Sequence, residues 1–446
     1  MKRLRWLADL AACGLLVGTG PVFADAVTDW NAIAQTTIAA NRPGAPGALD
    51  SALVQIAVHD AVQALDHRFE PYQVDIHHAK GSPSAAVAAA AHDVLAGLFP
   101  SQSASLDATY FDYIAANGLG NDPGLDVGHQ VAIGILPLQR KQPSVVDPFV
   151  GSNETGHWRP TPSFLGNPPA PPSGSAMLAP WMADSDPFAL TSPTRFRPGP
   201  PPALDSAQYT RDYNEVKSLG GFASTALTTL TRTAEQTDLA YFYSGNAIGQ
   251  WNEVLRSLAD QNLHRLSDSA RLLALANIAM ADSIITAWDS KRFYFYWRPL
   301  TAIREGDNDG NTQTVGDPDW QPLINNPNYP DYYSGYNSVT ASMTRVLALF
   351  FGTDRMSFDI KTAVPAAVIK TRTYKRFSDA AQDVVDARIY LGIHFRTADE
   401  VARTQSRLVA DWVFKHALLP LDDDDNDHHH DHGDDNDHHH GHGDRD

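Results

Sequence analysis

The sequence has almost no cysteine. Among its 446 residues there is one, Cys13, which lies near the N-terminus. If the chain is cleaved after Ala24, as argued below, the mature protein has none. A protein without cysteine cannot form a disulfide, use a thiolate nucleophile or bind zinc through sulfur. These three kinds of chemistry are therefore excluded for the mature chain.

Positive charge is also scarce. The chain has 34 Lys and Arg against 52 Asp and Glu, so its formal net charge is −18. Residues 422–446 contribute eleven Asp and one Arg, a net −10, which leaves −8 for the rest. Nucleic-acid binding needs a basic surface that neutralises phosphates, so no nucleic acid is expected as a partner. Any cluster of Lys and Arg in this chain is therefore informative.

The N-terminal stretch MKRLRWLADLAACGLLVGTGPVFADA has a basic start, an apolar middle and a small-residue end. It predicts a signal peptide over residues 1–24 and a secreted or periplasmic location. The motif LAAC at residues 10–13 offers an alternative, in which Cys13 carries a lipid anchor. No later apolar run approaches the ~20 residues that a bilayer requires, so we expect no membrane span.

Helical periodicity dominates residues 25–421. Apolar residues recur at three- and four-residue spacing rather than in strict alternation, and no segment makes a convincing strand. The sequence therefore predicts an all-α fold, a helical bundle built as a single domain over 25–421. The strongest helical patterns lie at residues 51–65, 84–99, 127–141, 269–298, 338–351 and 397–418.

A proline-rich segment interrupts the helical patterns. Residues 159–204 hold 13 of the 30 prolines, so the segment cannot be a regular helix or a central strand. It is either a linker between domains or an extended segment wrapped over one bundle. Its aromatic residues favour wrapping, because a solvated linker does not need them. With the adjacent Trp158, they are Phe164, Trp181, Phe188 and Phe196.

The C-terminal tail, residues 422–446, is of a different kind. The repeat DDNDHHHDHG at 424–433 returns as DDNDHHHGHG at 434–443, with no apolar side chain. Such sequence has nothing to bury, so the tail is predicted to be disordered. Its eight His and many Asp suit loose binding of zinc, copper or nickel, and the alternative is a solvated tail without that role.

Three short motifs carry candidate chemistry, and the first is a pair of cations. Lys291 and Arg298 are seven residues apart, which on an α-helix is about 20° short of two full turns and about 10.5 Å along the axis. The two side chains would then share a face and converge on one anion. Since Pro299 follows, the helix should end near Arg298. Solvated cations at this spacing are the alternative.

The second motif, Tyr333-Ser334-Gly335-Tyr336, precedes the helical pattern at 338–351. Gly335 lets the backbone approach a ligand closely, and amides at a helix N-terminus favour negative charge. Helix capping by Ser334, Asn337 or Ser338 would explain the serines without any ligand, so both interpretations remain open.

The third motif is DARIYLGIHFRTADE at residues 386–400. In a continuous helix Arg388 and His394 would face different sides. Gly392 is a natural helix terminator, and a break there would let His394 turn back toward Arg388. A histidine with a purely structural role is the alternative.

In this order, Lys-x6-Arg-Pro, Ser-Gly and Arg-x3-Gly-x-His resemble the vanadium-dependent haloperoxidases and the type 2 phosphatidic acid phosphatases that share their fold. The stretches AVHDAVQALDHRFEPY, AAAAHDVLAGLFP, PFALTSPTRFRPGPPPAL and YFYWRPLTAIREGDNDGN are similar to secreted bacterial members of the haloperoxidase branch. The resemblance covers nearly all of the mature chain except the tail. It implies an all-α helical bundle with a site for vanadate or phosphate.

The resemblance also implies roles for single residues. Three cations would neutralise the equatorial oxygens of the oxyanion, and a hydroxyl and an amide would donate further hydrogen bonds to it. His394 would coordinate vanadium or attack phosphorus. The cations are Lys291, Arg298 and Arg388, and the hydrogen-bond donors are Ser334 and Gly335.

Three positions depart from the family pattern. Tyr333 and Tyr336 replace the proline and the acid/base histidine of Pro-Ser-Gly-His, and a tyrosine with a pKa near 10 is a poor proton shuttle at neutral pH. The phosphatase pattern also has Asp four residues after the histidine. Ala398 occupies that position here, and Asp399 follows it. The residue that orients His394 is therefore left open.

Three functions follow. The first is a vanadate-dependent haloperoxidase that oxidises a halide or an organic substrate with hydrogen peroxide, with His394 and Tyr336 as its catalytic residues. The second is a secreted phosphatase that hydrolyses phosphate esters through a phosphohistidine. The third is a non-catalytic oxyanion-binding protein. No sequence feature predicts an oligomeric state.

Overall fold

Thirteen α-helices and one two-stranded sheet make up the residues described by a computed structural model, namely 25–141, 149–164 and 176–421. The predicted signal peptide, Cys13 and the Asp/His tail lie outside these residues. The helices are α1 (Ala26–Asn41), α2 (Pro46–Asp66), α3 (Pro83–Leu98), α4 (Ser103–Ala116), α5 (Gly124–Ile135), α6 (Ala207–Leu219), α7 (Ala234–Phe242), α8 (Ala247–Asn262), α9 (Leu266–Tyr294), α10 (Pro299–Arg304), α11 (Gly335–Phe350), α12 (Phe377–Tyr390) and α13 (Arg396–His416).

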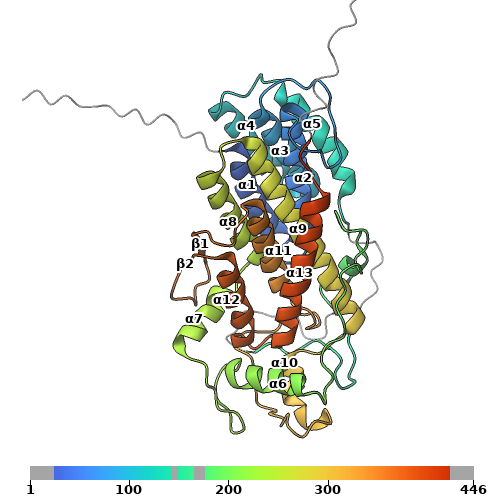
Figure 1. Cartoon of the computed structure of the whole chain (residues 1–446), viewed down its shortest axis with the longest axis vertical. Helices are drawn as coiled ribbons and strands as arrows, with labels where there is room; N and C mark the ends of the chain where they lie inside the picture. Colours follow the sequence, from blue (N-terminus) through green and yellow to red (C-terminus); the bar gives the residue numbers. More distant parts are fainter. Residues whose placement is uncertain (1–24, 142–148, 165–175, 422–446) are drawn as a thin grey trace, which may run out of the picture.

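Helices α1 to α5 gather at one end of the elongated molecule, and α6 and α10 lie at the other (Figure 1). The predicted all-α class is confirmed, and the patterns at 51–65, 84–99, 338–351 and 397–418 become α2, α3, α11 and α13. The pattern at 127–141 is helical to Ile135 and then continues as a short 3-10 turn.

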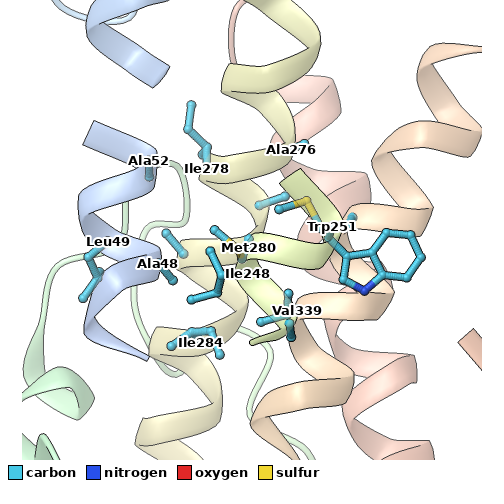
Figure 2. Packing of buried hydrophobic residues seen from close by; sticks show 14 of the residues in the cluster. Ala48, Leu49, Ala52, Ile248, Trp251, Ala276, Ile278, Met280, Ile284 and Val339 are labelled. Carbon is cyan, nitrogen blue, oxygen red and sulfur yellow. The ribbon is translucent and has the colours of Figure 1, made fainter. Parts of the chain in front are cut away.

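Helix α9 is the central element of the bundle. It packs against α2, α8, α11 and α13, and its side chains from Ser269 to Lys291 are all buried. Figure 2 shows small residues of α2 and α9, such as Ala48, Ala52 and Ala276, among larger apolar side chains. Small residues let neighbouring helices approach closely, and a helix that is buried on all sides belongs in a core.

The expectation that no later apolar run is long enough to span a bilayer was wrong for α9. The helix passes the length and composition test for a membrane span, but the apolar window that passes it is entirely buried inside the protein. The neighbouring helices cover its apolar surface, as they do around the core helix of a globular protein.

The structure also corrects the prediction that strands are absent. Strands β1 (Phe358–Lys361) and β2 (Thr371–Tyr374) pair in antiparallel register, with Phe358 opposite Tyr374. The side chains of β1 alternate between buried and exposed, and β1 packs on α8. Four residues give too few alternations for this pattern to stand out in a sequence.

The proline-rich segment wraps over the bundle wherever it is described, as predicted; residues 165–175 lie outside the described part. Trp158 and Phe188 are buried in the main hydrophobic cluster. Asp282 of α9 accepts hydrogen bonds from the backbone amides of Phe188, Ala189 and Leu190, at 2.6, 2.8 and 2.9 Å. A core helix thus satisfies backbone groups that proline-rich chain cannot pair with itself.

Candidate functional site

Lys291 lies on the last turn of α9 and is fully buried. Its Nζ donates hydrogen bonds to the backbone oxygens of Pro330, at 2.7 Å, and Asp331, at 2.9 Å. An ammonium group has three N–H donors, and the two backbone oxygens accept two of them. Burial, followed by the nearby Arg298, lowers the pKa of Lys291 well below its ordinary value. A bound anion would relieve both effects.

Arg298 does not continue the helix that carries Lys291, so the expected helical register between the two residues was wrong. Helix α9 ends at Tyr294, because Phe295 takes a left-handed conformation with φ +54° and its ring packs edge-on against Phe149. Arg298 is extended and precedes Pro299, the first residue of α10, in keeping with the preference of residues before proline. The two cations still meet, since both bind the loop before α11.

The Arg298 guanidinium is buried and largely held by backbone oxygens. Its Nε donates to the oxygen of Tyr329 at 2.8 Å, and its Nη1 donates to that of Ile393 at 2.6 Å. Nη1 also lies 3.2 Å from Nε2 of His394. Nη2 has no hydrogen-bond partner among the described residues. A buried N–H without an acceptor is costly, so this atom points to a missing ligand.

His394 reaches the same place because the chain breaks after α12. Gly392 adopts φ +76°, and a side chain there would also collide with the backbone oxygen of Gly220. The imidazole is buried, and its Nδ1 lies 2.7 Å from Oδ1 of Asp331. Burial, followed by Arg298, lowers the pKa of His394 well below its ordinary value, so the ring is neutral. The predicted break at Gly392 is confirmed.

Asp331 is the carboxyl group that lies against His394, although neither of its oxygens makes a hydrogen bond within the described residues. It is fully buried, and burial raises its pKa to about 7 although Arg298 and Lys291 oppose the shift. Asp331 was not among the site residues predicted from the sequence. A carboxylate three residues before Ser334, beside the Ser-Gly motif, was the feature of the sequence that could have indicated it.

Asp399, the other candidate, is bonded to the first turn of α11. Its Oδ1 accepts a hydrogen bond from Nδ2 of Asn337 at 2.8 Å, and burial raises its pKa to about 8. A carboxyl group with that pKa is mostly protonated at neutral pH. Asn337 and Asp399 thus tie the start of α13 to the first turn of α11.

Ser334 and Gly335 begin α11. The Ser334 oxygen accepts a hydrogen bond from the amide of Asn337 at 3.4 Å, so the capping interpretation holds. A capping hydroxyl keeps its own proton to donate, and a ligand role remains compatible with the cap. A side chain at Gly335 would press on the ring of Trp288, at 3.1 Å from Cζ3. Glycine therefore brings this helix N-terminus close to α9.

Arg388 and Tyr336 are the remaining predicted residues of the site, and they lie against each other. Nη1 of Arg388 donates to the backbone oxygen of Tyr243 at 2.9 Å, whereas its Nε has no partner among the described residues. The guanidinium carbon lies 4.5 Å from the centre of the Tyr336 ring. The Tyr336 hydroxyl donates to Oε1 of Gln250 at 2.6 Å. Burial raises the pKa of Tyr336 further above its ordinary value, so the phenol keeps its proton.

The cluster fits an oxyanion. Lys291, Arg298 and Arg388 bring three buried cations together around the neutral His394, and two of their nitrogen atoms, Nη2 of Arg298 and Nε of Arg388, have no acceptor among the described residues. Charge-assisted hydrogen bonds from such donors are strong in a dry environment. Elsewhere in the described ranges, no three His, Cys, Asp or Glu side chains are grouped to hold a metal cation.

Comparisons with known proteins agree with this geometry. The family model described as the VCPO second helical-bundle domain matches residues 271–423, which contain all the residues of the three motifs. Vanadium chloroperoxidase of Curvularia inaequalis is 25% identical over an alignment that covers 50% of this chain and 46% of that protein. The chain thus spans less than half of that relative's length.

Solved structures show the same fold. The crystal structure of the first bacterial vanadium-dependent iodoperoxidase superposes with a TM-score of 0.72 at 23% identity, covering 90% of this chain and 98% of that one. An apo-type bacterial vanadium-dependent chloroperoxidase gives 0.67 at 17% identity, covering 84% and 93%. At these identities the likeness establishes the helical architecture.

Proposed function

We propose that this chain is a member of the vanadium haloperoxidase superfamily, and that it is a vanadate-dependent enzyme that oxidises a halide, or an organic substrate, with hydrogen peroxide. The observation that carries the proposal is a pair of buried guanidinium nitrogens, Nη2 of Arg298 and Nε of Arg388, which have no acceptor in the described part of the chain. Both belong to cations gathered around a neutral histidine. An oxyanion is the ligand that would satisfy these donors.

Lys291, Arg298 and Arg388 would hold the oxygens of vanadate, and His394 would bind the vanadium atom. The Ser334 hydroxyl and the Gly335 amide would donate further hydrogen bonds. When bound, vanadate supplies a Lewis acid that activates peroxide. Phosphate is a tetrahedral oxyanion like vanadate, so it would occupy the same site.

Asp331, His394 and Tyr336 would have separate roles around the oxyanion. Asp331 lies against Nδ1 of His394 and would orient the ring. Nη1 of Arg298 lies close to both ring nitrogens, 3.4 Å from Nδ1 and 3.2 Å from Nε2. Neutral imidazole is the form that can donate its electron pair. Tyr336 keeps its proton, so it offers a hydrogen bond but not efficient proton transfer. We therefore expect turnover to be slower by about 10²- to 10⁴-fold than with a histidine at this position.

A phosphatase is the second candidate, and the Asp331–His394 pair favours it. A neutral histidine held by a carboxylate at Nδ1 can attack phosphorus through Nε2, and the three cations would stabilise the five-coordinate transition state. A non-catalytic oxyanion-binding protein is the third candidate, favoured by the protonated Tyr336.

Parallel assays on one preparation distinguish the candidates. Bromide oxidation would be measured with orthovanadate and hydrogen peroxide, and aryl-phosphate hydrolysis without vanadate, with His394→Ala as the matched control in both. We expect His394-dependent activity in the first assay. Activity in the second assay alone would replace the proposal with the phosphatase. Silence in both, with measurable oxyanion binding, would favour the non-catalytic protein.

A further inference from the structure

A groove lies on the surface next to the candidate site, between α8 and the chain that leaves β1. Figure 1 shows α8 and β1 on the same side of the bundle. The groove has a volume of about 490 Å³. Two glycines, Gly245 and Gly249, leave part of its wall without side chains. The other lining residues are Asn246, Gln250, Glu253, Lys361, Thr362, Ala363 and Val364.

Gln250 connects this groove to the cations. Its Nε2 donates to the backbone oxygens of Lys361, at 3.0 Å, and Phe242, at 3.4 Å. Its Oε1 accepts the hydroxyl proton of Tyr336 at 2.6 Å. All three bonds fix the amide in one orientation. A groove-lining side chain is thus locked onto a residue of the candidate site.

Tyr336 stands between the groove and the cation cluster. Its ring covers the Arg388 guanidinium at 4.5 Å, and its hydroxyl points to Gln250. Tyr336 is partly exposed, whereas Arg388 is 6% exposed and Lys291 and Arg298 are fully buried. Tyr329, whose ring lies 4.9 Å from both Lys291 and Arg298, is also partly exposed. Of the two tyrosines, Tyr336 is the one hydrogen-bonded to a residue that lines this groove. Two further grooves, one between α11 and α13 and the other between α1 and α4, are lined by none of these residues.

We propose that this groove is the port through which a small oxyanion reaches the cations, and that the Tyr336–Gln250 hydrogen bond is its gate. Gln250 acts as a positioning residue, because it holds the phenol over Arg388. When the bond breaks, the ring can turn away from the guanidinium and uncover a donor for the incoming anion. The inference rests on the proposed function, since it assumes that an oxyanion occupies the site.

Blocking the groove tests the port. A Cβ at Gly249 would meet no atom closer than 3.6 Å, so Gly249→Ala and Gly249→Phe can be compared without a clash at the backbone. Association of orthovanadate, and separately of phosphate, would be followed by stopped-flow tryptophan fluorescence. The association rate constant should fall with side-chain size, by about 10-fold for Gly249→Phe. Thr404→Phe, which places the same ring in the α11–α13 groove, should leave it unchanged.

Opening the gate is the complementary test. Gln250→Met keeps the length of the side chain but removes the acceptor, and Tyr336→Phe removes the donor. Both variants should raise the association and dissociation rate constants together, by about 5- to 10-fold, with little change in Kd. A structural role alone would lower Tm without changing both rate constants in this way.

The outcomes separate the two levels of inference. If calorimetry finds no binding of orthovanadate or phosphate to the wild-type protein, the proposed function fails. If the anions bind, but at rates that neither Gly249→Phe nor Gln250→Met alters, the port and gate are wrong while the proposed function stands.

Discussion

At the scale of single residues, the site is a set of buried cations with unused donors. Arg388 shows this most clearly, because one guanidinium N–H binds the Tyr243 oxygen while Nε has no partner in the described chain. A ligand that fills this place would gain a charge-assisted bond without displacing a protein contact.

We expect Arg388→Ala to weaken the binding of orthovanadate and phosphate by about 1.5–3 kcal/mol, the contribution typical of a hydrogen bond to a charged group. Calorimetric titration measures the change. Arg407→Ala removes an exposed arginine from the α11–α13 groove and serves as the control. Equal affinities for Arg388→Ala and the control would show that Arg388 does not contact the anion.

Tyr336→His should raise turnover more than affinity. The cations that bind the anion are unchanged, whereas an imidazole titrates near neutral pH and can transfer protons. We expect an increase of about 10-fold or more in kcat for bromide oxidation, with Kd for orthovanadate nearly constant. Tyr336→Phe is the control, since it removes the hydroxyl without adding a titrating group. Loss of a robust wild-type activity in Tyr336→His would instead make the tyrosine a catalytic or positioning group.

The cations and the histidine could be predicted from the sequence, but the residues that contact and position the site residues could not. Lys291, Arg298 and His394 stand in recognisable spacings. Asp331 and Gln250 do not, because each acts through a tertiary contact with a residue far away in the chain. Spacing within one element could not reveal either contact.

At the scale of elements, tertiary packing decided where helices end. The periodic pattern that ran to Arg298 stops four residues earlier, at Tyr294, where Phe295 turns left-handed and packs on the wrapping segment. By contrast, the break at Gly392 was predictable, since glycine favours the positive φ found there.

Asp282 should anchor the wrapping segment. Asp282→Ala leaves three backbone amides without their acceptor, so we expect a loss of at least about 2–3 kcal/mol in the free energy of unfolding. Asp282→Asn keeps one oxygen and should lose less. Chemical denaturation gives the stabilities, and limited trypsin digestion should cut earlier at Arg195, which is not followed by proline. Unchanged stability in Asp282→Ala would mean that other contacts hold the segment.

A network of histidines and carboxylates joins α3, α4 and α5. His92 lies 2.8 Å from Asp93 and 2.9 Å from Asp107, and His129 lies 2.6 Å from the other oxygen of Asp93. Burial opposes protonation of His92, but the bonds with both aspartates outweigh it, so the pKa of His92 is raised. The pKa of Asp93 is lowered by the two histidines against the effect of burial.

These shifts predict a pH-dependent contribution to stability. A raised histidine pKa stabilises the fold below the ordinary value of 6.5, and this contribution is lost as pH rises through the folded value. The lowered Asp93 pKa stabilises above 3.8 and is lost as pH falls through its own folded value. His92→Gln should therefore lower Tm more at about pH 5.5 than at about pH 8.5. His77→Gln, at an exposed histidine, is the control; an equal loss at both pH values for His92→Gln would contradict the prediction.

At the scale of the whole molecule, the protein is acidic, but its candidate site is lined by buried cationic side chains. The net charge is −18, yet the residues gathered around His394 include three buried cations. Surface charge would repel a small anion at long range, and ordinary salt screens that repulsion beyond about 10 Å. Affinity then depends on the local donors and not on the overall charge.

Deletion of residues 422–446 should leave both Tm and oxyanion affinity nearly unchanged. The segment has no apolar side chains to bury, and it contributes −10 of the net charge. Differential scanning calorimetry and orthovanadate titration of the full and shortened chains test this expectation. A decrease of several degrees in Tm would show that the tail docks on the body.

The backbone oxygens that hold Lys291 and Arg298 bear on how this protein can evolve. They belong to Tyr329, Pro330, Asp331 and Ile393, and a peptide carbonyl is present whatever side chain its residue carries. Point mutations at positions 329, 330 and 393 can therefore alter the local chemistry while the two cations stay oriented. The positions of Lys291 and Arg298 thus depend on the backbone conformation and not on these side chains. The side chains that face a substrate can therefore change while the two cations keep their places.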